Sequence, residues 1–263
     1  MITIKEHIFK QKYRQNFLND QGILQKIYTS ISPNPNDLII EVGPGSGNLT
    51  KWLQKYNCNI ICYEIDKSLQ EQLESIKNEK TQIFFKDFLD ADLTADLSNI
   101  QYENLYVIAN IPYYITTPII KKITFANINP QGLVLMVQKE VADRLSAKPK
   151  TKDYGYITVL LNYFYDIKKL FNVSKNCFYP RPNVDSAIIK LTPNNKEKTD
   201  FNIFNNLIES AFQFKRKNLR NNLKIFNLDI ISSVLDGNGY SLNNRAEEIP
   251  IEVYIEISNK LKQ

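Results

Sequence analysis

Leu38-Ile39-Ile40-Glu41-Val42-Gly43-Pro44-Gly45-Ser46-Gly47 is the stretch of sequence that decides the fold. A short, mostly apolar run leads into a glycine-rich turn, and residues 48–56 follow with the pattern of a helix. Glycines let the backbone adopt positive φ angles and come close to a bound ligand. The stretch therefore predicts a buried strand, a ligand-binding turn and a helix, in that order.

The same alternation of strand and helix continues along the chain. We predict further strands over 59–65, 83–85, 105–109 and 133–137, and closing strands over 165–173 and 184–191. Helices are predicted over 20–30, 66–77, 115–125, 140–147 and 156–164. Because a βαβα order requires crossover connections, the expected fold is α/β, with a Rossmann-like, mostly parallel sheet covered by helices on both faces.

A change of character near residue 193 predicts a second domain. Residues 194–199 form a polar linker, and Phe201, Phe204 and Ile208 then recur at helical spacing. We expect one domain over 1–193, including an N-terminal extension, and a small helical domain over 200–263.

The composition points to a globular cytoplasmic protein. Hydrophobic residues make up 43% of the 263 residues and charged residues 23%. No apolar run approaches the length of a membrane span, and the Lys-rich N-terminus lacks the apolar core of a signal, so we expect a cytoplasmic protein without membrane association. We also expect a monomer. Three cysteines and the single histidine, His7, do not have the spacing of a metal site, and none is expected.

The net charge of +5 is less informative than its distribution. Lys215, Arg216, Lys217, Arg220 and Lys224 form a run without acids, and further basic runs cover residues 5–14 and 148–152. Charge runs are often solvated faces. Separate basic runs in one chain nevertheless favour a surface that follows a phosphate backbone.

Polar residues stand at the ends of successive predicted strands. Glu64 lies 21 residues beyond Gly43, where a carboxylate can accept both ribose hydroxyl protons. The turn lacks the Lys-Ser/Thr pair of phosphate-binding loops, and Pro44 and Glu41 favour S-adenosylmethionine. Asp87 is placed to accept from the cofactor's adenine amine. One acid alone is more often a solvated strand end, but the group together predicts a site.

The run of residues 105–109 ends in Asn110, Ile111, Pro112 and Tyr113. An adenine amine is a poor nucleophile because its lone pair is delocalised into the ring. The carbonyls of the Asn110 side chain and the Ile111 backbone would accept its two protons and turn the lone pair toward an electrophile. Tyr113 would stack on a base taken out of its helix, with Phe178 as a second ring. The alternatives are an Asx-type turn and core aromatic residues.

Together these motifs resemble the ribosomal RNA small-subunit adenine dimethyltransferases nearly end to end. The residues that carry the resemblance are Gln15-Asn16-Phe17-Leu18, Glu41 to Gly47, Glu64-Ile65-Asp66, Asp87, Asn110-Ile111-Pro112-Tyr113, Arg144-Leu145, Ala147, Pro149, Lys152, Tyr154-Gly155, Phe178-Tyr179-Pro180-Arg181-Pro182, Val184-Asp185-Ser186, Ala211-Phe212, Arg216-Lys217, Leu219-Arg220-Asn221-Asn222-Leu223 and Arg245-Ala246-Glu247-Glu248.

The resemblance implies dimethylation, with S-adenosylmethionine, of two adjacent adenosines near the 3′ end of small-subunit RNA in a pre-30S-like particle. It implies a catalytic segment of Asn110, Ile111, Pro112 and Tyr113. The implied cofactor contacts are Asn16, Leu18, Gly43, Glu64, Asp87 and Asn110. The implied RNA contacts are Tyr113, Phe178, Arg216, Lys217 and Arg220.

Three other functions compete with this one. A macrolide-resistance methyltransferase would act on large-subunit RNA. A non-enzymatic factor would serve ribosome assembly or transcription, and a DNA adenine methyltransferase would need a base-reading domain that the chain has no room for. The Arg144-to-Pro149 loop and the 216–222 segment favour the small-subunit function, and intact Glu64, Asp87 and Asn110 favour catalysis.

Overall fold

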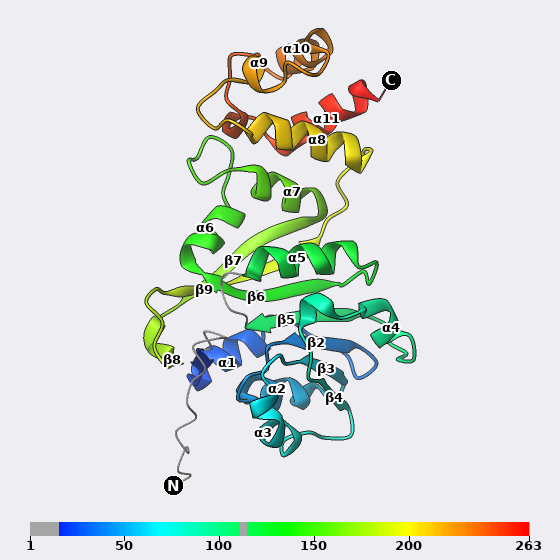
Figure 1. The fold of residues 1–263 in the computed structure, drawn as a ribbon, viewed down its shortest axis with the longest axis vertical. Helices are drawn as coiled ribbons and strands as arrows, with labels where there is room; N and C mark the ends of the chain where they lie inside the picture. Colours follow the sequence, from blue (N-terminus) through cyan, green and yellow to red (C-terminus); the bar gives the residue numbers. More distant parts are fainter. Residues whose placement is uncertain (1–15, 111–114, 263) are drawn as a thin grey trace. The chain divides into compact units, whose positions relative to one another are not determined.

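The computed structural model describes residues 16–110 and 115–262, and the chain divides into two compact units (Figure 1). The first unit comprises Met1–Ala142 and Lys168–Thr192, and the second comprises Asp143–Ile167 and Pro193–Gln263. The sequence analysis placed residues 143–167 with the sheet, whereas the structure groups them with the C-terminal helices. Ile111, Pro112, Tyr113 and the basic run at 5–14 lie outside the described residues.

Within the described residues, a seven-stranded sheet of order β4-β3-β2-β5-β6-β9-β7 forms the centre of the first unit. Neighbouring strands from β4 to β6 are parallel, and β9 runs antiparallel to β6. The predicted α/β, Rossmann-like fold is thereby confirmed. The strands are β2 Leu38–Val42, β3 Asn59–Tyr63, β4 Thr81–Phe84, β5 Leu105–Asn110, β6 Gly132–Gln138, β7 Tyr165–Val173 and β9 Ser186–Pro193.

Helices and short 3-10 turns connect these strands. They are α1 Gln21–Tyr28, α2 Asn48–Leu53, η1 Gln54–Tyr56, η2 Lys67–Leu69, α3 Gln70–Glu74, η3 Phe88–Asp90, α4 Leu93–Leu97, α5 Thr116–Phe125, α6 Lys139–Leu145 and η5 Lys175–Cys177. A separate two-stranded ladder pairs β1, Phe17–Leu18, with β8, Phe178–Tyr179. None of the helices in the described ranges is long and apolar enough to cross a membrane.

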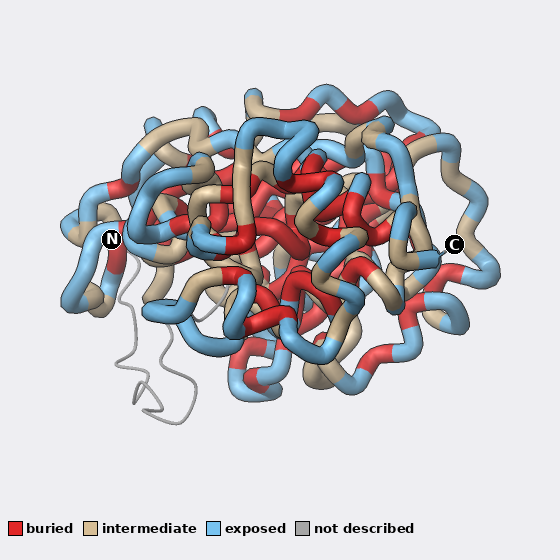
Figure 2. Tube along the Cα trace, turned by 90° about the horizontal axis from the view of Figure 1, so that it is seen from above, coloured by how far each residue is buried: buried red, intermediate tan, exposed pale blue. Residues whose placement is uncertain are grey.

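The strands are apolar because both faces of the sheet are covered. Every residue of β2 is buried, and so is nearly all of β6. In Figure 2 the buried stretches gather mainly in the middle of the view, and most of the outer loops are exposed. Parallel strands flanked by helices on both sides are expected to read as continuous hydrophobic runs, as these do.

Side-chain caps decide where several helices begin. The predicted cap Asp20 accepts a hydrogen bond from the Ile23 amide at 3.0 Å, so α1 starts at Gln21. The predicted helix over 66–77 is instead the short pair η2 and α3, which Asp66 caps by accepting from Ser68. The sequence analysis missed α4, which Asp92 caps through the Ala95 amide.

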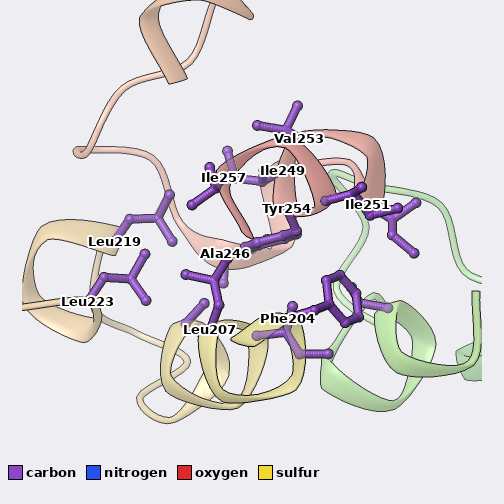
Figure 3. Packing of buried hydrophobic residues seen from close by; sticks show 14 of the residues in the cluster. Phe204, Leu207, Leu219, Leu223, Ala246, Ile249, Ile251, Val253, Tyr254 and Ile257 are labelled. Atoms are coloured by element: carbon purple, nitrogen blue, oxygen red, sulfur yellow. The ribbon is translucent and has the colours of Figure 1, made fainter. Parts of the chain in front are cut away.

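The second unit has a hydrophobic core of its own. Its helices are α7 Tyr156–Phe164, α8 Phe201–Phe212, α9 Leu219–Asn222, α10 Leu228–Gly237 and α11 Ile251–Leu261, with the 3-10 turn η6 Ala246–Glu248. Figure 3 shows Phe204 and Leu207 of α8 facing Tyr254 of α11. The Tyr163 ring of α7 stacks on Phe204 with centroids 4.5 Å apart. This packing explains why residues 143–167 group with the second unit.

The order of the strands marks one rim of the sheet as the place for a ligand. The chain moves outward from β2 through β3 to β4, and then returns to β5 on the other side of β2. In open parallel sheets the connections diverge at such a switch point and leave a crevice beyond the carboxyl ends of the strands. Here that crevice is expected beyond β2 and β5.

A carboxyl group is buried inside the central strand β2. Glu41 Oε2 accepts hydrogen bonds from Thr50 Oγ1 at 2.7 Å and from Cys62 Sγ at 3.6 Å. Among the described residues, no donor reaches its Oε1. The pKa of Glu41 is raised from 4.5 to about 7, mainly by burial and to a smaller extent by the nearby charge of Glu64, while the hydrogen bonds from Thr50 and Cys62 oppose the shift. This carboxyl therefore keeps its proton to a much higher pH than an ordinary glutamate.

Glu41 should make the stability of the protein fall with rising pH. Because its folded-state pKa is the higher one, the folded state holds the proton between about pH 4.5 and about pH 7, and its contribution is lost across that window. The loss should be about 3 kcal/mol in the free energy of unfolding, measured by urea titration. Glu41→Gln should lack this part of the slope, whereas Glu79→Gln, at an exposed position, should keep it. Equal slopes in Glu41→Gln and wild type would contradict the assignment.

Candidate active site

The register of three strands sets three polar positions in one row. Val42 pairs with Tyr63 of β3 and with Ala109 of β5. The residues that follow these three, Gly43, Glu64 and Asn110, therefore stand side by side at the carboxyl rim. The Gly43 amide donates to the Tyr63 carbonyl at 2.9 Å, which extends the ladder to the start of the turn. The structure brings these sequence-predicted positions together.

The turn after β2 depends on its glycines. Gly43, Gly45 and Gly47 have φ angles of 75°, 57° and 77°, a region that residues with a side chain rarely adopt. A Cβ on Gly45 would lie 2.9 Å from Phe17 Cδ1, and a Cβ on Gly47 would collide with Ile76. The backbone of the turn is thus in close contact with the Phe17 and Ile76 side chains, and only glycine fits at these positions.

Glu64 ties the turn to the next strand. Its Oε2 accepts from the Gly45 amide at 3.0 Å, and its Oε1 accepts from the Asp66 amide at 2.9 Å. The side chain is buried, which raises its pKa, while the two amide hydrogen bonds lower it in part. A carboxylate oxygen can accept more than one hydrogen bond. Glu64 therefore keeps acceptor capacity for hydroxyl groups of a ligand.

Asp87 lies just beyond the end of β4. Its Oδ1 accepts from the Leu89 amide at 2.8 Å, which makes it the N-cap of η3. The preceding Lys86 forms an ion pair with Asp96 at 2.6 Å, and Asp96 also accepts from the Tyr63 hydroxyl at 2.9 Å. These contacts fix the segment that carries Asp87. Asn110, the last residue of β5, is partly buried and is aligned with Met136 of β6.

The N-terminal segment lies against the turn. Asn48, the first residue of α2, donates from Nδ2 to the Leu18 carbonyl and to Asn19 Oδ1, both at 2.9 Å. The Phe17 ring contacts Gly45, as the crowding at Gly45 shows. The structure thus brings Phe17 to the glycine turn and ties Leu18 to the first residue of α2, while the roles of Asn16 and Leu18 as cofactor contacts stay predictions. The sequence analysis missed Asn48, because its role depends on a segment distant in sequence.

Phe178 is a buried residue of the first unit's core. The sequence analysis gave it as a second ring against a target base, with a core residue as the alternative. In the structure it lies opposite Leu18 in the β1–β8 ladder, is 6% exposed and packs in the core of the first unit. The segment 178–182 was expected to be irregular, yet its first two residues form β8. Its neighbour Tyr179 carries the exposed ring of the pair.

The remaining predicted RNA contacts belong to the second unit. Arg216, Lys217 and Arg220 are exposed, in and after the turn between α8 and α9. Lys215 Nζ donates to the Lys152 carbonyl at 2.7 Å. Two basic runs that are distant in sequence are therefore neighbours on the surface of this unit.

The acceptors at the rim fit S-adenosylmethionine better than a phosphate-bearing cofactor. Glu64 and Asp87 supply negative charge, which suits a sulfonium group and ribose hydroxyls and would repel a pyrophosphate. The described residues hold no cluster of His, Cys, Asp and Glu with the geometry of a metal site. The arrangement can hold a cationic nucleoside beside the Asn110 amide.

Comparison with known proteins agrees with this chemistry. The protein from Mycoplasma mobile named "Ribosomal RNA small subunit methyltransferase A" is 40% identical over 94% of this chain and 96% of its own length. The protein of the same name from Thermotoga petrophila is 37% identical over 100% of this chain and 93% of its own.

Two solved structures share the fold. One, titled a dimethyladenosine transferase from Plasmodium falciparum, has a TM-score of 0.75 at 24% identity and covers 92% of this chain and 95% of its own. The other, titled 23S rRNA methyltransferase ErmE, has a TM-score of 0.73 at 25% identity and covers 94% and 100%. The family described as "Ribosomal RNA adenine dimethylase" matches residues 6–263. The chain therefore belongs to the ribosomal RNA adenine dimethylase family, as its motifs predicted.

Proposed function

We propose that the protein dimethylates the exocyclic amines of two adjacent adenosines near the 3′ end of small-subunit ribosomal RNA and thereby takes part in the maturation of that subunit. Membership of the family makes it a methyltransferase that uses S-adenosylmethionine. The observation that carries the proposal is the row of Gly43, Glu64 and Asn110 at the switch point of the sheet, with the Gly45 amide held 3.0 Å from Glu64.

Each part of the row has one task. The glycine turn and Glu64 hold the ribose and amino-acid parts of the methyl donor, with Asn16 and Leu18 closing over them and Asp87 accepting from the adenine. The donor, when bound, supplies a methyl group on a positively charged sulfur. The Asn110 carbonyl accepts a hydrogen bond from the target amine and turns the amine's lone pair toward that methyl carbon.

The transfer balances without a side-chain base. The amine nitrogen forms a bond to the methyl carbon while the carbon–sulfur bond breaks, and the electron pair of that bond stays on sulfur. The methylated amine is briefly cationic and strongly acidic, so its proton passes to water. The gain is mainly positional, and well-oriented reactants can lower a barrier by about 7–11 kcal/mol.

Asn110 acts within a wider segment. Ile111, Pro112 and Tyr113 complete the catalytic segment in this proposal, with Tyr113 stacking on the target base. These three residues lie outside the described part of the chain.

We also propose that the second unit docks the RNA. Exposed Arg216, Lys217 and Arg220, next to the Lys152 loop, form a basic surface that a phosphate backbone would neutralise. We expect the substrate to be a pre-30S-like particle, bound by a monomer in the cytoplasm. The relatives' names support the small subunit as the substrate, whereas the ErmE title keeps the large-subunit alternative in view.

The position of the methyl groups tests the proposal directly. Small-subunit particles from cells that lack this gene should be incubated with the full-length protein and S-adenosylmethionine. Reverse transcription across the RNA 3′ end should then stop at two adjacent adenosines. Stops in large-subunit RNA would favour the rival methyltransferase, and no methyl transfer to either RNA would favour a non-enzymatic factor.

Asn110→Ala should separate chemistry from cofactor binding. Loss of the amide carbonyl should lower turnover on small-subunit particles by about a thousandfold, because the amine is no longer oriented. Calorimetry should find S-adenosylmethionine binding within a few-fold of wild type. Asn104→Ala removes an amide just before the start of β5, where it contacts Asp37, and should leave turnover unchanged. Wild-type turnover in Asn110→Ala would refute the role of Asn110.

Glu64→Gln should act on the cofactor. A neutral amide keeps the size of the side chain but loses the charge that favours the sulfonium and one acceptor for the ribose, so the Kd for S-adenosylmethionine should rise about 10- to 100-fold. Because burial raises the pKa of Glu64, wild-type affinity should also weaken as pH falls through that raised value and the carboxylate takes up a proton. Glu79→Gln, at an exposed position, is the matched control. An unchanged Kd in Glu64→Gln would remove Glu64 from the site.

A further inference from the structure

The short ladder of β1 and β8 has two faces of different character. Leu18 and Phe178 are opposed, and both are buried in the core of the first unit. Phe17 and Tyr179 form the other opposed pair, and opposed residues of a ladder project to the same face. Phe17 is partly buried, whereas Tyr179 is 57% exposed. On this face of the ladder, the Phe17 ring is therefore the more buried one and the Tyr179 ring the more exposed one.

The strand that carries this exposed ring is paired with a segment that touches the glycine turn. The Phe17 ring contacts Gly45 of the glycine turn. The Asn48 side chain holds the Leu18 carbonyl at 2.9 Å, which joins β1 to the first turn of α2. Tyr179 is the cross-strand neighbour of Phe17, so its backbone is one strand spacing away from a segment that touches the turn.

The surroundings of Tyr179 suit a nucleotide. Val184, in the same loop, is another exposed large hydrophobic side chain. Arg181, two residues beyond Tyr179, is exposed and carries the positive charge that a phosphate needs. Proteins that read single-stranded RNA commonly place unstacked bases on such aromatic rings.

We propose that Tyr179 is a stacking platform for the base next to the target adenosine. The inference rests on the proposed function, because the substrate there contains two adjacent adenosines. While one of them presents its amine to Asn110 at the end of β5, the other is its chain neighbour and loses the stacking partner that the extruded base provided. Leu18 and Phe178 close the inner face of the ladder, so the ring of Tyr179 serves a base outside the strand-end crevice.

A fluorescent base tests the contact. Small-subunit particles are prepared with 2-aminopurine in place of one of the two adenosines, so that the other remains the target. Binding of the wild-type protein should quench the fluorescence, because stacking on an aromatic ring quenches 2-aminopurine. Tyr179→Leu should abolish most of the quench and raise the KM for particles about tenfold, within the range that one base–aromatic stack supplies. Tyr179→Phe should retain the ring and behave as wild type.

Two controls separate stacking from a structural effect. Tyr179→Leu should keep the KM for S-adenosylmethionine and keep kcat within about twofold, since a leucine preserves the strand and the stack contributes to binding. Phe125→Ala removes a ring that is 50% exposed at the end of α5, just before β6 starts, and should change neither the quench nor the KM. The Asn110→Ala protein should still quench, because it lacks only the orienting amide.

The outcomes distinguish this inference from the function on which it rests. If the wild-type protein methylates the particles and Tyr179→Leu shows the same quench and the same KM, the platform is refuted and the proposed function stands. If the wild-type protein methylates no particle, the proposed function itself fails. A quench that disappears in both Tyr179→Leu and Tyr179→Phe would also contradict stacking, because the phenyl ring should be sufficient.

Discussion

The in-register pairing of β2 with both β3 and β5 is the constraint on which the site depends. Strand pairing with Val42 opposite Tyr63 and Ala109 fixes where each neighbour ends. A slip of one residue would turn every side chain to the other face of the sheet and move Glu64 or Asn110 out of the row. Apolar burial on both faces of β2 opposes such a slip. The hydrophobic core thereby sets the position of the polar groups.

The two buried carboxyl groups near that core, Glu64 and Glu41, differ in their hydrogen-bond partners. Glu64 is buried at the rim, where two backbone amides accompany it and a ligand can supply further donors. Glu41 lies two residues before the turn, inside β2, with donors on one oxygen only among the described residues. Burial raises the pKa of both carboxyl groups, and hydrogen bonds oppose the shift in each, from side chains at Glu41 and from backbone amides at Glu64. A cationic ligand near the rim would favour the charged form of each carboxyl group. Cofactor binding is therefore linked to the loss of protons from Glu41 and Glu64.

The sequence predicted what depends on neighbours along the chain. Runs such as 38–42 and 105–109 became β2 and β5 because a strand buried on both faces needs an unbroken apolar run. The residues that end these apolar runs predicted the site positions Gly43, Glu64 and Asn110, because a ligand binds beyond the carboxyl ends of parallel strands. The β1–β8 ladder joins segments about 160 residues apart and leaves no local periodicity. For that reason the sequence analysis left Phe178 open between a second ring for RNA and a core residue, and it missed Asn48. The grouping of residues 143–167 with α8 and α11 likewise depends on contacts that no local pattern shows.

Each unit also has a separate source of stability, which frees part of its surface. In the second unit, Tyr163, Phe204 and Tyr254 supply the core, so the turn after α8 needs no apolar contacts and can carry exposed Lys217 and Arg216. In the first unit, the buried pair of Leu18 and Phe178 stabilises the ladder, so the opposite face can carry an exposed aromatic ring. Like charges that are crowded on a surface lower stability by repulsion. An exposed ring that is held in one orientation lowers it through lost side-chain entropy. In both units the buried core offsets that cost, so residues proposed to face RNA can be exposed without destabilising the fold.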